Sequence, residues 1–277
     1  MTDRPRGLIV TPHPYADESA ASWIQRTCQM HGVKLPHLAD SLGIRLGSDP
    51  DVSISWEHLI HIGLGAGVRL ERLRSLAMVF AAVRTLPRLQ QLLNHDTSGA
   101  PTYRFCARCF LGDKIPYLRI AWRFLDWVIC PVHRTPLADY CPHCGAPISS
   151  CRPALGVAAN EESLNVSHCA VCHESLAAGA HEQSPNVALV TDIDIAVQNS
   201  VVSAVLNGFF RIEGFNRKLE LGFYLWLREH PGWSNLPPHH FDFQDPMLVS
   251  SIVTRLLHIY RNATGAVPMR CISPWVT

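Results

Sequence analysis

The 277-residue sequence lacks several features that would assign it to common classes of protein. It has no apolar run long enough to cross a membrane, since the longest candidate, Leu76 to Val83, is short and is bounded by Ser75 and Arg84. The apolar stretch before Thr11 is too short for the central region of a secretory signal. We therefore expect a cytoplasmic protein that has no membrane partner and keeps its thiols reduced.

The sequence also lacks the motifs of several large enzyme classes. No lysine follows a glycine, which excludes a Walker phosphate-binding loop. A His-Glu-x-x-His pair is absent, and none of the fifteen histidines is followed two residues later by glutamate, as a zinc deaminase requires. No catalytic constellation can be assembled, so we expect that this chain is not an enzyme.

The net charge is small, +1 at neutral pH, but the charges are spread unevenly. Residues 69–134 carry eleven Lys/Arg against four Asp/Glu, and acidic residues outnumber basic ones on both sides of this region. A basic middle in a nearly neutral chain suits a protein that touches phosphate with one face, although a solvated helical face would look the same. The candidate DNA-contacting residues are Arg69, Arg72, Arg104, Arg108, Lys114, Arg119, Arg123 and Arg134.

Aromatic residues alternate with two of these arginines. Tyr117, Trp122 and Trp127 are interleaved with Arg119 and Arg123. Such an arrangement can stack nucleic-acid bases, but packing inside a small zinc fold is the more common use of it, and we favour packing.

Eight residues of the kind that bind metal form four pairs, and two residues separate the members of every pair. Two such pairs complete a closed tetrahedral site, so the spacing predicts two structural Zn²⁺ ions per chain, each held by consecutive pairs, rather than reduced core cysteines or a redox pair. The first predicted site consists of Cys106, Cys109, Cys130 and His133, and the second of Cys141, Cys144, Cys169 and Cys172.

The order of the pairs also allows a cross-braced RING, in which the first and third pairs would share one ion. Seven residues separate His133 from Cys141, whereas a RING leaves only two or three, and this gap favours consecutive pairing. Cys28, Cys151 and Cys271 lie outside the pattern, and we expect them to be small buried hydrophobic residues.

The remaining sequence predicts a mainly α fold in three regions. Residues 1–100 form an N-terminal helical domain, residues 101–185 a tandem zinc-finger region and residues 186–277 a C-terminal helical region, with a linker at Asn94 to Thr102. Apart from two short helices near the start, the expected helices run from about Trp56 to Leu64, Arg69 to Leu93, Asp194 to Asn207, Asn216 to Arg228 and Pro246 to Arg261.

The two short helices near the start are spaced as in a helix-turn-helix. Residues 17–19 offer caps for a first helix that Gly32 ends, and a second helix with Pro36 in its first turn ends at Gly43. The pattern fits a DNA-reading pair of helices, and it fits an ordinary helical bundle as well.

Together, these stretches resemble the TniQ family of transposition target-selection proteins, which includes the TnsD proteins. The sequence departs from the family's pattern in two places: Ala107 stands where proline is usual, and Arg134 where glycine usually follows the ligand histidine. The matching stretches are Pro12 to Pro14, Asp17 to Ser19, Ser22 to Arg26, Arg104 to Phe110, Pro116 to Arg119, Trp122, Cys130 to His133, Leu137 and Cys141 to Gly145.

The resemblance implies an adaptor, in which a helical domain with a helix-turn-helix and a pair of zinc fingers link two assemblies. One is a target-recognition complex such as a CRISPR effector, and the other is an AAA+ transposition ATPase that recruits the transposase. Target DNA and a second copy of the chain are further candidate partners. Because phosphate contacts dominate DNA affinity, a net charge of +1 favours this adaptor over a target selector or transcription regulator that reads DNA by itself.

Overall fold

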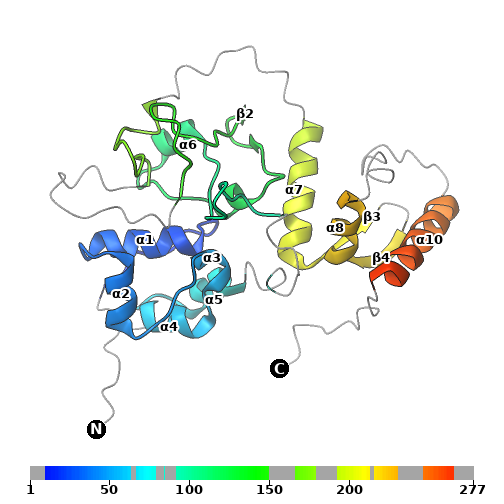
Figure 1. Cartoon of the computed structure of the whole chain (residues 1–277), viewed down its shortest axis with the longest axis horizontal. Helices are drawn as coiled ribbons and strands as arrows, with labels where there is room; N and C mark the ends of the chain where they lie inside the picture. Colours follow the sequence, from blue (N-terminus) through cyan, green and yellow to red (C-terminus); the bar gives the residue numbers. More distant parts are fainter. Residues whose placement is uncertain are drawn as a thin grey trace, which may run out of the picture. The chain divides into compact units, whose positions relative to one another are not determined.

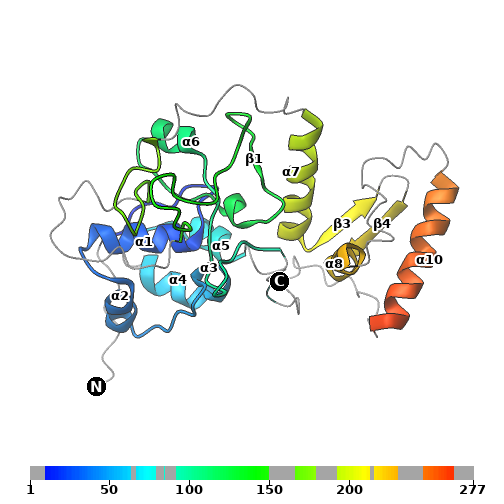
Figure 2. The same cartoon turned by 45° about the horizontal axis from the view of Figure 1, so that its top comes forward.

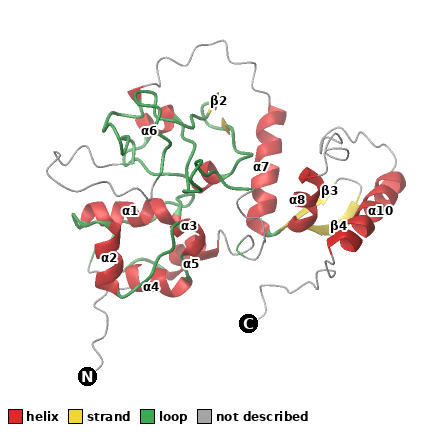
Figure 3. Ribbon diagram, in the orientation of Figure 1, coloured by secondary structure: helices red, strands yellow, loops and turns green. Residues whose placement is uncertain are grey.

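The structure is a computed structural model that describes residues 10–63, 67–78, 84, 92–149, 166–178, 192–212, 215–229 and 246–264. The chain divides into two compact units, residues 1–202 and residues 203–277. Helices are the main regular structure of both units, as predicted, and the second unit also contains a β-hairpin (Figures 1 and 3). None of the described helices is both long enough and apolar enough to cross a membrane.

The first unit begins with a bundle of short helices around its own apolar core. Trp23, Ile24, Leu42, Leu59 and Leu73 are buried in this core. The helices are α1 (Ala20–Met30), α2 (Leu35–Leu42), α3 (Pro50–Ser53), α4 (Trp56–Gly63) and α5 (Leu70–Met78). Residues 79–91, which the sequence predicts as the continuation of α5, lie outside the described residues except for residue 84.

The ends of α1 and α2 follow from the turn residues that the sequence displays. Ser19 caps α1, since its side chain accepts a hydrogen bond from the Ser22 amide at 3.1 Å. Gly32 and Gly43, which follow the two helices, have φ angles of +61° and +64°, a conformation that glycine adopts without steric cost.

The cysteine-rich region has little regular structure and a second apolar core. Its elements are α6 (Ala107–Gly112), the 3₁₀ helix η2 (Ile120–Arg123) and a small hairpin of β1 (Ile129–Cys130) and β2 (Thr135–Pro136). Tyr103, Phe105, Phe110, Leu118 and Trp122 pack there with the cysteines. Because few residues of this region lie in helices or strands, its shape depends on this core, which includes the cysteines.

Helix α7 (Asp192–Asn207) begins in the first unit and is attached to the cysteine-rich region by Gln198. The side-chain oxygen of Gln198 accepts hydrogen bonds from the amides of Val128 and Ile129, at 3.3 and 3.1 Å, and its nitrogen donates to the Ile129 carbonyl at 2.7 Å. These bonds complete the hydrogen bonding of β1 at an otherwise open edge.

The second unit corrects one prediction. The expected helix from Asn216 to Arg228 begins instead as a strand, because β3 (Phe209–Ile212) pairs with β4 (Phe215–Glu220) and the helix α8 (Leu221–Glu229) follows. Pairing with Phe209 and Phe210 outweighs the helical spacing of the sequence. Helix α10 (Pro246–Thr264) completes the unit, and Figure 2 shows the hairpin beside both helices.

Candidate metal centres

The first metal cluster brings together Cys106, Cys109, Cys130 and His133. Cys106 and Cys109 lie at the start of α6, Cys130 lies in β1, and His133 lies in the turn to β2. The Nδ1 atom of His133 is 3.4 Å from the sulfurs of Cys106 and Cys109 and 3.5 Å from that of Cys130. The Sγ atoms of Cys109 and Cys130 are 3.6 Å apart.

The second cluster brings together Cys141, Cys144, Cys169 and Cys172. The Sγ atoms of Cys141 and Cys172 are 3.7 Å apart, and those of Cys144 and Cys169 are 3.6 Å apart. Cys144 is exposed in this cluster, whereas all three cysteines of the first cluster are buried.

Both clusters fit a tetrahedral ion. A zinc–sulfur bond of about 2.3 Å places two sulfurs of a tetrahedral site about 3.8 Å apart, close to the separations found here. Within each cluster all four donor atoms lie within 4.8 Å of one another. The pairs combine consecutively, as the spacing predicts, and not in the crossed manner of a RING. A Cys₃His or Cys₄ set fills every position of a tetrahedral ion and leaves none for water.

Three of the four ligand pairs end in the same backbone turn. The residue after each pair, Arg134, Gly145 or His173, has a positive φ of +53°, +69° or +63°. Its amide donates to the carbonyl of the first ligand, at 2.7 Å to Cys130 and 2.9 Å to Cys141 and Cys169. The departure of Arg134 from the family's glycine therefore falls on a position where glycine would be unstrained.

Hydrogen bonds lower the thiol pKa of one cysteine in each cluster. Burial raises the pKa of Cys169, but hydrogen bonds from the amides of Cys172 and Val171 outweigh burial and lower it to about 7. In the first cluster, hydrogen bonds from the thiols of Cys109 and Cys130 lower the pKa of Cys106. The thiolate is the form that binds metal, so these contacts favour the ligand state of Cys106 and Cys169. Neighbouring thiols and burial raise the pKa values of the other ligand cysteines, Cys109, Cys130, Cys141 and Cys172.

The cysteines outside the pattern are only partly accounted for. Cys28 is buried in the helical core, as expected, and burial raises the pKa of its thiol to about 11. Cys151 and Cys271 lie outside the described residues. His143 lies next to the second cluster without joining it, since its Nε2 atom is 3.3 Å from the Ser175 carbonyl oxygen.

The helical bundle and the first cluster meet along a short backbone pairing. The Ser19 amide donates to the Leu118 carbonyl at 3.0 Å, and the Ile120 amide donates to the Asp17 carbonyl at 2.8 Å. The Ser22 hydroxyl accepts from the Leu118 amide at 2.9 Å. The stretches that carry the family resemblance near residues 17–22 and 117–120 are thus in contact.

Glu18 is buried at the start of α1 and is fully satisfied there. It accepts hydrogen bonds from Arg26 at 2.6 Å and from the Ser22 hydroxyl at 2.9 Å. Burial raises its pKa, and the charge and hydrogen bond of Arg26 oppose that rise.

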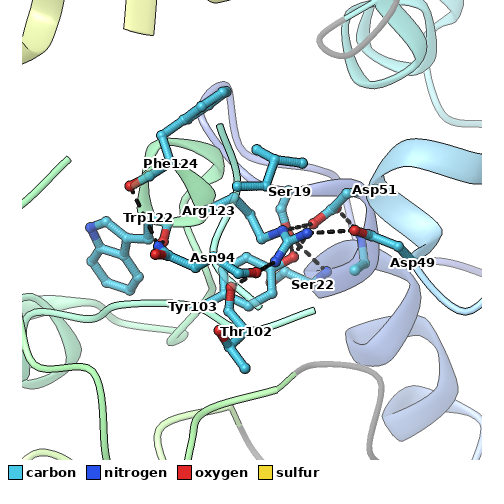
Figure 4. A network of polar contacts seen from close by, with 12 residues as sticks. Ser19, Ser22, Asp49, Asp51, Asn94, Thr102, Tyr103, Trp122, Arg123 and Phe124 are labelled. Atoms are coloured by element: carbon cyan, nitrogen blue, oxygen red, sulfur yellow. Dashed lines mark hydrogen bonds and ion pairs between the residues drawn. The ribbon is translucent and has the colours of Figure 1, made fainter. Parts of the chain in front are cut away.

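Arg123 is the centre of a second set of contacts across the same junction (Figure 4). Its side chain is 0% exposed and forms ion pairs with Asp49 and Asp51, while its guanidinium also donates to the carbonyls of Asn94 and Thr102. Asp51 in turn accepts from the Ala21 amide at 2.8 Å and from Tyr103, whose hydroxyl is 2.9 Å from that of Ser19. The stretch from Asn94 to Thr102 is therefore an ordered part of the junction, where the sequence predicts a linker.

Four of the eight candidate DNA-contacting residues have internal partners. Arg123 is buried, so the prediction that it contacts DNA is not supported by its position. Arg119 pairs with Asp113 and Asp17. Arg104 pairs with Asp139, and Arg134 with Asp192. The other four candidates, Arg69, Arg72, Arg108 and Lys114, are exposed.

The alternating aromatic residues are used for packing. The Arg119 guanidinium lies over the rings of Tyr117 and Trp122, at 4.5 and 4.9 Å from their centroids. Tyr117 stacks on Tyr15 at 4.3 Å, and Arg26 covers the other ring of that pair. These faces are occupied from within, so they are not open to nucleic-acid bases.

Sequence reasoning did not single out Asp49, Asp51 or Tyr103. All three lie far from Arg123 in the sequence. They become its neighbours only because α3 packs against the cysteine-rich region. Pro50, which lies between Asp49 and Asp51, indicates a turn, but no local pattern indicates burial.

Fold and site define a class of protein: a small helical bundle joined firmly to tandem Cys/His metal clusters. Residues 9–137 match the TniQ family, a stretch that includes the bundle, the junction and the first cluster. This stretch of the chain is a TniQ domain, so the resemblance predicted from the sequence is confirmed there. No curated protein matches the chain.

Proposed function

We propose that the protein is a target-selection adaptor in DNA transposition. It connects a target-DNA recognition complex, such as a CRISPR effector, to an AAA+ ATPase and through it to the transposase. The TniQ domain supports the general assignment to transposition-associated target selection. The adaptor role, these partners and the absence of catalytic activity in this chain are our inferences.

The observation that carries the adaptor role is the use of arginines inside the protein. Arg104, Arg119 and Arg123 are held by carboxylates and carbonyls, so much of the basic middle of the chain supports the fold. Neutralised phosphates supply most of the affinity of a protein for DNA. Because Arg104, Arg119 and Arg123 are committed to internal contacts, the TniQ domain has fewer cations for phosphate, which suits docking on an assembly that already holds the target.

Two finer assignments belong to this proposal. Both clusters bind Zn²⁺, which suits all-thiolate and thiolate–imidazole sets in tetrahedral sites and stabilises the fold without chemistry of its own. Helices α1 and α2 form a helix-turn-helix that, together with the exposed residues Arg69, Arg72, Arg108 and Lys114, touches target DNA within the assembled complex.

The alternative is a protein that reads a DNA sequence by itself, as a target selector or a transcription regulator. The exposed residues of α2, which include His37 and Asp40, leave room for this role. Footprinting distinguishes the two functions, because a self-sufficient reader protects one defined site without other proteins.

A reconstituted insertion reaction tests the adaptor. Omitting this chain should abolish directed insertion while the recognition complex still binds its target. Withholding the recognition complex alone should also abolish directed insertion. Continued insertion at one fixed sequence without that complex would show that this chain selects the target, and would reject the adaptor.

A further inference from the structure

Within the described part of the second unit, helices cover one face of the β-hairpin. Phe210 pairs with Leu219, and both pack with Phe223 of α8 in the core of this unit. Residues of α10 complete the same core. Side chains alternate between the two faces of a strand, so the neighbours Phe209 and Lys218 point the other way. The Lys218 ammonium accordingly lies 4.1 Å from the centroid of the Phe209 ring, outside the core.

Among the described residues of this hairpin, the exposed charges have one sign. Arg211, Arg217 and Lys218 are exposed, and none of them forms an ion pair with any residue that the structure describes. The acidic residue of the ribbon, Glu220, is half-buried. Burial raises its pKa, and the charge of Arg261 on α10 opposes that rise. The described part of the hairpin therefore carries three exposed cations and no exposed carboxylate.

These residues differ from the arginines of the first unit. There Arg119 and Arg123 donate to carboxylates and carbonyls of the chain itself. A guanidinium group has five donors in a fixed plane, and when no carboxylate of the chain engages them they are available to an external anion such as phosphate. Arg211 and Arg217 have no carboxylate partner among the described residues, and both lie on the narrow ribbon, whose register shifts between Phe210 and Ile212.

We propose that the β3–β4 hairpin is a contact surface for duplex DNA, which it binds through backbone phosphates. A two-stranded ribbon has the dimensions of the DNA major groove. Phosphate contacts fix position and carry no sequence information, so this surface holds the protein on DNA without selecting a site. The inference does not depend on the adaptor role, because it concerns binding by the chain alone.

The test is the salt dependence of binding by the full-length chain. A fluorescent 30-base-pair duplex of arbitrary sequence is titrated at several salt concentrations with the unaltered protein and with R211Q/R217Q/K218Q. Each lost phosphate contact lowers the log–log slope by about 0.9, so the triple variant should lose about 2.7 and bind more weakly at low salt. An unchanged slope would overturn the proposal.

Two further variants keep this test decisive. The charge-preserving R211K/R217K should retain the slope, and a loss equal to that of the glutamine variant would show that the effect is not electrostatic. If the triple variant melts early because Lys218 no longer covers Phe209, R211Q/R217Q keeps that contact and should lose about 1.8 in slope. Tighter binding of the unaltered protein to duplex RNA than to DNA would also overturn the proposal. Failure in this assay leaves the insertion test of the adaptor unaffected.

Discussion

The residue that follows three of the ligand pairs has a positive φ angle, whichever side chain it carries. Gly145, Arg134 and His173 all take the left-handed conformation, and all donate to the carbonyl of the first ligand. In L-residues other than glycine this conformation costs roughly 1–2 kcal/mol. Substitutions at these positions therefore measure how much the left-handed conformation lowers the free energy of unfolding.

Replacing Gly145 by alanine should destabilise the protein by about 1–2 kcal/mol, from backbone strain alone. A Cβ atom built at Gly145 has no other atom within 4 Å, so no steric clash adds to this cost. Chemical denaturation of the metal-loaded protein measures the change. The matched variant is R134G, which should cost nothing or stabilise slightly, because its ion pair with Asp192 is exposed and weak. Equal losses in the two variants would contradict the explanation.

The two metal clusters should differ in how readily they lose their ions. Cys144 of the second cluster is exposed and Cys172 is half-buried, whereas Cys106, Cys109 and Cys130 are all buried. We expect two Zn²⁺ ions per chain and biphasic release to a chelator, with the second cluster emptied first. Native mass spectrometry of C144S should show one ion and a single slow phase. A single ion in the unaltered protein, or loss of the slow phase in C144S, would contradict this assignment.

Among the structural elements, the junction between the helical bundle and the cysteine-rich region depends most on one side chain. Arg123, the last residue of η2, is buried against Asp49 and Asp51 at the start of α3. Removing one partner of a buried ion pair leaves an uncompensated charge and typically costs 3–5 kcal/mol. R123L should therefore be destabilised by about that amount, as denaturant unfolding will measure.

The pH dependence of R123L identifies the cause. Burial raises the pKa of Asp51 and the charge of Arg123 opposes this, so the substitution raises that pKa further. A folded-state pKa above the unfolded value of about 3.9 means that the folded protein holds the proton more tightly. The deficit of R123L should thus be small near pH 4 and grow as the pH rises through the folded-state pKa. In R123L/D51N this pH dependence should disappear, and if it persists Asp51 is not its source.

The sequence predicts those elements whose cause is local. Ser19, Gly32 and Gly43 mark the ends of α1 and α2, and the two-residue spacing predicts which four donors meet in each cluster. It does not predict the β-hairpin at Phe209, because residues 216–228 have helical spacing and only pairing with β3 decides their structure. Nor does it predict the burial of Arg123, which depends on carboxylates 74 and 72 positions earlier in the chain.

In the whole molecule, the regions that the sequence composition separates are not the ones that the structure separates. Composition separates a helical domain at residues 1–100 from the zinc-finger region, yet hydrogen bonds from residues 17–22 to residues 117–120 and the ion pairs of Arg123 join these two regions. Two apolar cores are thus held together by polar contacts. The compact units of the chain divide instead at Val202, within α7.

The last prediction follows from this division. A structural zinc site contributes about 10–16 kcal/mol in finger peptides, which equals or exceeds the total stability of a typical domain, so C106S should unfold the first finger. Because residues 117–123 of that finger satisfy Ser19, Ser22 and Asp51, α1 should lose its protection in the same step. Hydrogen exchange read by mass spectrometry should show fast exchange in residues 20–30 of C106S and native protection in residues 221–229 of α8. The matched variant C144S, altered in the second cluster, should leave residues 20–30 protected. Protection of α1 in C106S would mean that the bundle folds without the metal site, and exposure of α8 would mean that the two units unfold together.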